Sequence, residues 1–238
     1  YKFADKELRN GAVERAHSLD YPWDIAKQMA QQGLLGITIP EKDGGIGGSL
    51  MDAVIAIQTV ASVCPRSADV VQAGNFGAIR VLGEYEALIS VGMTEPDAGS
   101  AVTELKTSAT KDGNGWRING SKIFTTHGPH ADFILAYVRF GPGTGGIGSV
   151  MIETKAEGVH LGKRSAFMSD EEWVEILFDN VYVPDEQVVL GEGGFKKQIA
   201  GFNVERIGNT SRSVALGRYA FEEAKGWALQ RKQFGKLL

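Results

Sequence analysis

Two short stretches combine residue types that suit a flat ligand bearing phosphates. The first, Val91 to Ser100 (VGMTEPDAGS), is an apolar run that ends in a turn of small residues and hydroxyls. Pro96 biases Glu95 towards an extended conformation, and Gly99 lets the backbone approach a ligand closely. The second, Lys122 to Gly128 (KIFTTHG), adds an aromatic residue and two threonines. An ordinary polar turn and an ordinary strand are the alternative interpretations, because threonine is a good β-former.

Helical segments are expected on both sides of these stretches. Three segments before them and one after them carry apolar residues at helical spacing. Gly33 ends the first segment, and Pro65 ends the second. The segments are 23–32, 51–64, a weaker 66–84, and 195 to about 234, the last as one long helix or two.

Between these helices the apolar period changes to two, which predicts strands. Asn119-Gly120 is a strong two-residue hairpin signal, and the segment 112–115 (DGNG) is a second tight connection. Several short strands at hairpin spacing predict an antiparallel sandwich or barrel. The expected strands are 105–110, 116–118, 121–126, 133–140, 148–154 and 174–184.

The segment 141–146 (GPGTGG) matches the glycine spacing of a dinucleotide-binding fingerprint. That fingerprint needs a helix to begin there, because the helix N-terminus holds the pyrophosphate. Here the next segment is an expected strand, so the glycines are interpreted as a hairpin loop.

Composition narrows the class of protein. The chain has 238 residues and a formal net charge of −4, which argues against a nucleic-acid partner. Cys64 is the only cysteine, so no intramolecular disulfide forms. No apolar run approaches the length of a membrane span. We expect a soluble protein of the cytoplasm, or of the mitochondrial matrix if the source is eukaryotic.

Read together, TEP-x-AGS and K-x-F-x-T-x-G closely resemble the flavin loop and flavin wall of the acyl-CoA dehydrogenase family. Further motifs resemble the family in the same order along nearly the whole chain. They are PW-x7-GLLG-x-TIPE from Pro22, GG-x-G from Gly44, FDNVYVP from Phe178, LGEG from Leu190 and RKQFGK from Arg231.

The resemblance implies an α+β multidomain fold. It comprises an N-terminal helical domain (1–88), a middle antiparallel β-sandwich or barrel domain (89–190), and the start of a C-terminal helical bundle (191–238). Two departures stand out: the segment between Leu82 and Ile89 is shorter than usual, and most of the bundle is missing. We therefore expect the functional chain to continue past Leu238, since the last helix has an apolar stripe to bury.

The resemblance also implies FAD as the cofactor. Val91, Gly92, Met93 and Thr94 would lie at the flavin ring, with Gly99 and Ser100 towards the pyrophosphate. Phe124, Thr125 and Thr126 would form the wall, where Phe124 replaces the usual Trp and Thr126 approaches the reactive nitrogen. Arg231, Gln233 and Phe234 would contact the FAD of a neighbouring subunit, so a homodimer or homotetramer is expected.

On the substrate side, the resemblance implies that Ser100, Asn203, Val204, Glu205 and Arg206 contact the acyl-CoA. Asn203 stands where the family usually has Asp. Isovaleryl- and long-chain-type members carry their catalytic base at the helix position of Glu205, whereas most members carry it in the absent last domain. A surface carboxylate near Arg206 is the alternative interpretation of Glu205.

The implied reaction is α,β-dehydrogenation of an acyl-CoA thioester, with electrons passing to an electron-transferring flavoprotein. A desulfinase, an oxidase and a non-catalytic scaffold for acyl-CoA and FAD are the alternatives. The segment 170–173 (DEEW) is expected as a solvated turn with a core aromatic residue. No metal site is expected, because the sequence places no further metal-ligating residues at ligand spacing beside His127, His130 or His160.

Overall fold

A computed structural model describes residues 1–76, 87–168 and 170–237. Contacts divide the chain into two units. The helical unit comprises Tyr1–Ala16, Pro22–Phe76 and Val204–Leu238, and the β unit comprises His17–Tyr21 and Gly77–Asn203. The order of helices, sheet and final helix confirms the predicted fold class. The domain boundaries at residues 88 and 190 stay predictions.

Three helices organise the first part of the helical unit: α2 (Trp23–Gln31), α3 (Leu50–Ala61) and α4 (Pro65–Phe76). Gly33 follows α2 with a φ of 67°, a left-handed conformation that glycine adopts without steric cost. At the start of α3, Ser49 and Asp52 form a capping box that satisfies two backbone N–H groups. Short helical segments are η1 (Ala4–Leu8), α1 (Ala12–Ala16) and η2 (Glu41–Asp43).

Pro65 begins a helix, and this corrects the prediction that it ends one. Helix α3 already stops at Ala61, and Pro65 is the first residue of α4. Proline is tolerated there because the first helical N–H has no intrahelical partner. The third predicted segment is confirmed as far as Phe76, whereas 77–84 lies outside the described residues. The shortened segment before Ile89 also falls mainly outside them.

The β unit contains one eight-stranded sheet with the strand order β6-β7-β3-β2-β4-β5-β8, and β1 pairs with β4. Most neighbours are antiparallel, as predicted, but β1 and β2 each pair with β4 in parallel. The strands are β1 (Ile89–Gly92), β2 (Ser108–Asp112), β3 (Gly115–Thr126), β4 (Phe133–Arg139), β5 (Ile147–Glu153), β6 (Val159–Ala166), β7 (Glu172–Pro184) and β8 (Val188–Leu190).

Strands β3, β4, β5 and β7 contribute buried side chains to one core. In β7, Val174, Ile176 and Phe178 are buried while the residues between them are exposed, the period of two that a half-buried strand requires. These side chains pack with the centre of β4 and β5, whose side chains are almost wholly buried. The glycine-rich segment 141–146 joins β4 to β5, which confirms the hairpin interpretation.

The Asn119-Gly120 hairpin prediction is wrong. Strand β3 continues through both residues, with a shift of register against β7 between Ile118 and Gly120. Gly120 has a φ of 143°, and a Cβ atom there would lie 2.6 Å from Thr107 Oγ1. The glycine therefore allows the backbone of β3 to lie close to Thr107. The predicted turn at 112–115 is confirmed, since Asp112 pairs with Gly115.

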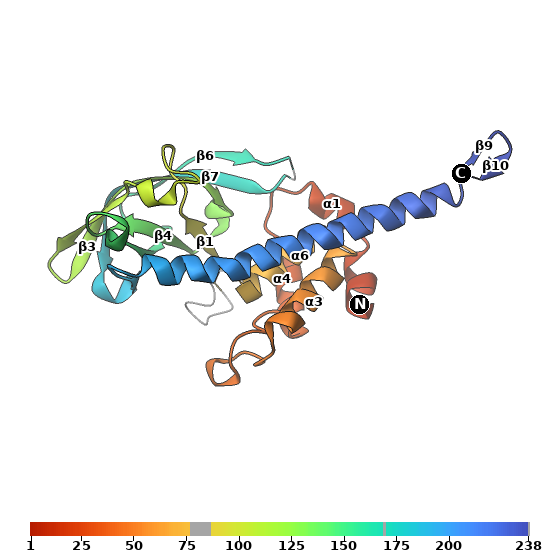
Figure 1. Cartoon of the computed structure of the whole chain (residues 1–238), viewed down its shortest axis with the longest axis horizontal. Helices are drawn as coiled ribbons and strands as arrows, with labels where there is room; N and C mark the ends of the chain where they lie inside the picture. The colour runs from red at the N-terminus through yellow and green to blue at the C-terminus, as the bar shows by residue number, and fades with distance from the viewer. Residues whose placement is uncertain (77–86, 169, 238) are drawn as a thin grey trace. The chain divides into compact units, whose positions relative to one another are not determined.

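The final helix, α6, runs unbroken from Phe195 to Ala228 (Figure 1). It ends before Phe234, where the prediction placed its end, because a small hairpin of β9 (Lys232–Gln233) and β10 (Lys236–Leu237) follows. Phe234 and Gly235, at the turn of that hairpin, both have positive φ. Among the described residues, no helix is both long enough and apolar enough to span a membrane.

Candidate functional site

The β unit brings the two stretches singled out in the sequence side by side. Strand β1 and the loop after it lie along β3. Ser90 Oγ donates to the Thr126 carbonyl at 2.8 Å, and the Ile123 N–H donates to the Thr94 carbonyl at 2.9 Å. The predicted flavin loop and flavin wall are therefore neighbours in the folded chain.

The loop turns tightly after Thr94. Glu95 and Ala98 exchange two backbone hydrogen bonds, both 3.1 Å long, which place Pro96 and Asp97 at an exposed tip. Gly99 and Ser100 follow and are exposed. A Cβ atom at Gly99 would meet no atom within 4 Å, so this part of the backbone is open to close approach.

A buried ion pair fastens the loop to β3. Lys122 Nζ lies 2.7 Å from Glu95 Oε1, and the side chains are 0% and 6% exposed. Lys122 Nζ also donates to the Met93 carbonyl at 3.3 Å. The sequence alone assigns neither residue a role, although both stand inside the two motifs. A charged residue within an apolar strand pattern was the available signal.

The pKa values of the pair follow from this burial. Burial lowers the pKa of Lys122 to about 8, although its contact with Glu95 acts in the opposite direction. Burial alone would raise the pKa of Glu95, but hydrogen bonds from Lys122, Thr107 and Lys106 outweigh it and leave that pKa lowered. At neutral pH the pair is therefore ionised.

The wall is made by a bulge in β3. The register against β7 shifts between Lys122 and Thr125, and Phe124 takes a left-handed φ of 55°. Its ring is 49% exposed and packs against the Trp173 ring with centroids 4.7 Å apart. Thr125 is fully buried, and its Oγ1 has no hydrogen-bond partner among the described residues. An exposed aromatic residue thus directly follows Ile123, the residue of β3 that bonds to the loop at Thr94.

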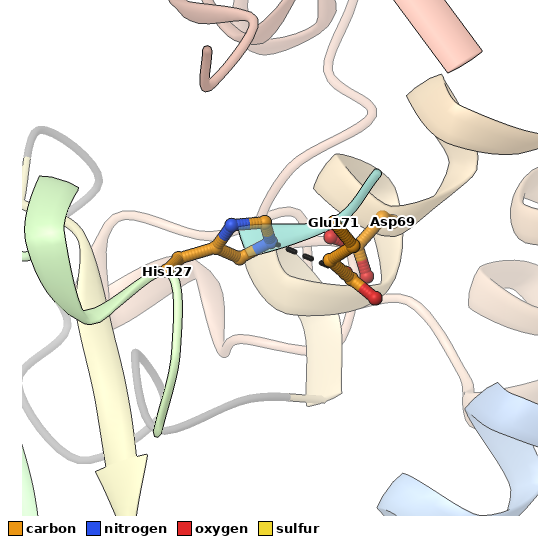
Figure 2. A group of neighbouring side chains, drawn as sticks. All are labelled: Asp69, His127 and Glu171. Atoms are coloured by element: carbon orange, nitrogen blue, oxygen red, sulfur yellow. Dashed lines mark ion pairs between the residues drawn. The ribbon is translucent and has the colours of Figure 1, made fainter. Parts of the chain in front are cut away.

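Two histidines that follow the wall contact carboxylates. His127 Nε2 lies 3.4 Å from Glu171 Oε1 (Figure 2), and His130 Nε2 lies 2.9 Å from Glu172 Oε2. Glu172 is only 2% exposed, so the solvated turn predicted for 170–173 is wrong at this residue. Glu172 Oε2 lies within ion-pair distance of His130, but neither of these two buried atoms makes a hydrogen bond among the described residues.

These residues fit the flavin of FAD. Because the peptide bond is trans, a Met93 carbonyl directed at Lys122 turns the Thr94 N–H the opposite way. That N–H has no hydrogen-bond partner among the described residues. A flavin carries carbonyl acceptors along one ring edge and needs apolar contact on its face. The Thr94 N–H and the exposed Phe124 ring offer both.

The candidate base lies on α6, within the helical unit. Gln72 Nε2 of α4 donates to Glu205 Oε2 at 3.3 Å and to Asn209 Oδ1 at 2.9 Å. Gly208 permits this contact, since a Cβ atom there would lie 2.8 Å from Gln72 Cδ. Glu205 is half-buried, which a fully solvated surface carboxylate would not be.

The other predicted contact residues are placed as follows. Val204 is half-buried, whereas Asn203 and Arg206 are exposed. Arg231, Gln233 and Phe234 are also exposed, and the Arg231 guanidinium lies 5.9 Å from the Trp227 ring centroid. The roles expected for these residues stay predictions.

Comparison with known proteins gives the same family along the whole chain. Models of the acyl-CoA dehydrogenase N-terminal, middle and C-terminal domains match residues 1–86, 90–181 and 192–238. A short-chain specific acyl-CoA dehydrogenase of Clostridium acetobutylicum is 30% identical, over 100% of this chain and 68% of that protein.

Two further similarities extend this picture. Subunit CarC of the caffeyl-CoA reductase-Etf complex of Acetobacterium woodii is 32% identical, over 98% of this chain and 68% of that protein. The structure of butyryl-CoA dehydrogenase from Megasphaera elsdenii has a TM-score of 0.88 and 28% identity, and the match covers 100% of this chain and 68% of that one.

Proposed function

This chain belongs to the acyl-CoA dehydrogenase family, and we propose that it binds FAD and dehydrogenates an acyl-CoA thioester to the 2,3-enoyl-CoA. One observation carries the proposal: the loop and the wall lie together in the β unit. Loop carbonyls are bonded to β3, and the Thr94 N–H has no partner within the part of the chain that the structure describes. The similarity to butyryl-CoA dehydrogenase supports the same reaction class.

In the proposed site, Val91, Gly92, Met93 and Thr94 hold the edge of the flavin ring. Gly99 and Ser100 present open backbone and a hydroxyl to the pyrophosphate, and Ser100 also contacts the substrate. Phe124 and Thr126 cover the opposite side of the ring and exclude water, and Thr125, which is fully buried, stands between them in the strand. When bound, FAD would supply the acceptor for the hydride that leaves the β-carbon.

Glu205 is proposed as the base that takes the α-proton of the thioester. A base must accept a proton where water is scarce, and its half-buried position suits that task. Gln72 donates to the Glu205 carboxylate and so holds it in place. Asn203, Val204 and Arg206, on the same stretch of α6, are proposed to contact the CoA chain.

The partners follow from the same proposal. An electron-transferring flavoprotein is proposed as the electron acceptor, and the relative from Acetobacterium woodii, whose complex is named with an Etf, supports it. A homodimer or homotetramer is proposed, in which Arg231, Gln233 and Phe234 contact a neighbouring subunit's FAD. The exposed apolar side chains of α6 support such an assembly. The cytoplasm, or the mitochondrial matrix in a eukaryote, is the proposed compartment.

A second candidate is another reaction on the same cofactor. One relative is named as part of a reductase complex, so reduction of an enoyl-CoA is the specific alternative that the comparisons favour. The residues that hold the cofactor would be unchanged. The direction of electron flow would distinguish the two activities.

The test is an anaerobic panel of acyl-CoA thioesters mixed with the FAD-loaded protein, with the oxidised flavin band followed in time. We expect at least one thioester to bleach the band. Glu205→Gln should retain FAD and bind the thioester, yet slow the bleaching by roughly 10²–10⁴-fold. An unchanged rate in this variant would remove Glu205 from the role of base while leaving the flavin assignment intact.

A further inference from the structure

We propose that Glu95 and Lys122 are the positioning pair of the flavin site, which fixes the Met93–Thr94 peptide so that its N–H group faces the cofactor. The proposal rests on the proposed binding of FAD. It assigns a role to a buried ion pair that contacts neither substrate nor cofactor itself.

The Lys122 side chain passes beside Gly92, at the end of β1, to reach its partners. A Cβ atom at Gly92 would lie 3.3 Å from Lys122 Cγ, so the glycine leaves room for the lysine stem. The ammonium then donates to Glu95 Oε1 at 2.7 Å and to the Met93 carbonyl at 3.3 Å. One buried cation thus bonds the two residues that flank Thr94 in the flavin loop.

Glu95 is itself immobilised by the backbone. Its Oε2 accepts from the Lys106 N–H at 2.6 Å, and its Oε1 accepts from the Thr107 N–H at 2.9 Å. The carboxylate therefore cannot follow the lysine if the loop shifts. The loop is held between β3 on one side and the segment leading to β2 on the other.

Two consequences follow for the Met93–Thr94 peptide. Because the carbonyl points to the ammonium, the N–H on the same planar unit must point away from β3. The positive charge behind the carbonyl also polarises the peptide, and a polarised peptide is a better hydrogen-bond donor. The pair would thus both aim and strengthen the donor that the flavin ring edge needs.

If the ion pair had only a structural role, its neutral replacement would have a different effect on FAD binding. Buried ion pairs are often replaced by neutral groups of similar volume without loss of stability. If the pair only fills space, a neutral replacement of both members should fold and bind FAD as the native protein does. If the pair positions the peptide, that replacement should fold but bind FAD weakly.

The test compares FAD affinity in two matched double variants, each titrated as apoprotein and followed by quenching of flavin fluorescence. Lys122→Met with Glu95→Gln removes the buried pair and the donor to Met93. Lys106→Met with Asp97→Asn removes a neighbouring ion pair, 3.0 Å long and 75% exposed at both side chains. The first variant should raise the Kd for FAD about ten-fold and alter the visible band of the bound flavin. The second should leave both unchanged.

Melting of the apoproteins separates binding from folding. A first variant that melts near the wild type but binds FAD weakly supports the proposal. A first variant with wild-type Kd and an unaltered flavin band overturns it. If that variant does not fold, Glu95→Gln alone, which keeps the shape of the side chain, must show a weaker affinity in the same direction, and an unchanged Kd there overturns it. Failure of the wild type to bind FAD would instead overturn the proposed function.

Discussion

The carboxylate of Glu95 accepts hydrogen bonds from two backbone N–H groups and from the ammonium of Lys122. These contacts outweigh the effect of burial and lower the pKa of Glu95 in the folded state. A carboxylate whose pKa is lowered on folding adds stability above its unfolded pKa, about 4.5 for a glutamate. That contribution is lost as the pH falls through the unfolded pKa towards the folded one.

We therefore expect Glu95→Gln to weaken the dependence of the free energy of unfolding on pH in the acid range. Below about pH 4.5 the wild type should lose free energy of unfolding faster than the variant does, because only the wild type must protonate this buried group. Urea unfolding at a series of pH values measures the difference. Asp97→Asn, which removes an exposed carboxylate two residues away, serves as the control and should retain the wild-type slope.

Helix α6 meets α4 at a point where only glycine fits. A Cβ atom at Gly208 would lie 2.8 Å from both Gln72 Cδ and Phe76 Cδ2. Gly217, nine residues further along the same helix, has no atom within 4 Å of its would-be Cβ. Two glycines in one helix thus meet different surroundings.

Substitution by alanine should separate them. Gly208→Ala is expected to destabilise the protein by about 1–3 kcal/mol, since the packed neighbours must move. Gly217→Ala should stabilise it by up to about 1 kcal/mol, because alanine is the better helix former. Chemical denaturation measures both, and equal effects of the same sign would contradict the packing at Gly208.

The sequence predicted the helices and strands better than it predicted their junctions. Periodicity sufficed for α2, β4 and β5, where packing and local preference agree. It failed at Asn119-Gly120, because the turn chemistry there is overridden by pairing of β3 with β7 along its whole length. Partners distant in the sequence decide such a case, and a single sequence does not contain them.

In the candidate site too, the sequence revealed the motifs but not the contacts between residues that are distant in the chain. The resemblance to the family singled out the loop and the wall, because an ordinary turn and an ordinary strand would suit the same residues. The motifs did not reveal that Glu95 pairs with Lys122 or that Gln72 contacts Glu205, since these contacts join residues 27 and 133 positions apart. The burial of Glu172 was missed for the same reason: its partner His130 comes from another element.

The whole molecule presents large apolar side chains to solvent along α6. Phe221 and Trp227 are 63% and 64% exposed, and Leu216 is 48% exposed. Exposed apolar surface of this kind is typical of interfaces. We expect sedimentation velocity to show a dimer or tetramer, and Phe221→Glu with Trp227→Glu to shift it towards monomer. A wild type that sediments as a monomer at all concentrations would contradict the proposed assembly.

The loop and wall of the β unit are proposed to hold FAD. The most direct measurement incubates the purified protein with FAD, removes free FAD by gel filtration and records the visible spectrum. We expect a yellow protein whose flavin band elutes with the chain and is released on denaturation, because no covalent link is proposed. A colourless protein whose melting temperature is unmoved by added FAD would contradict this proposal.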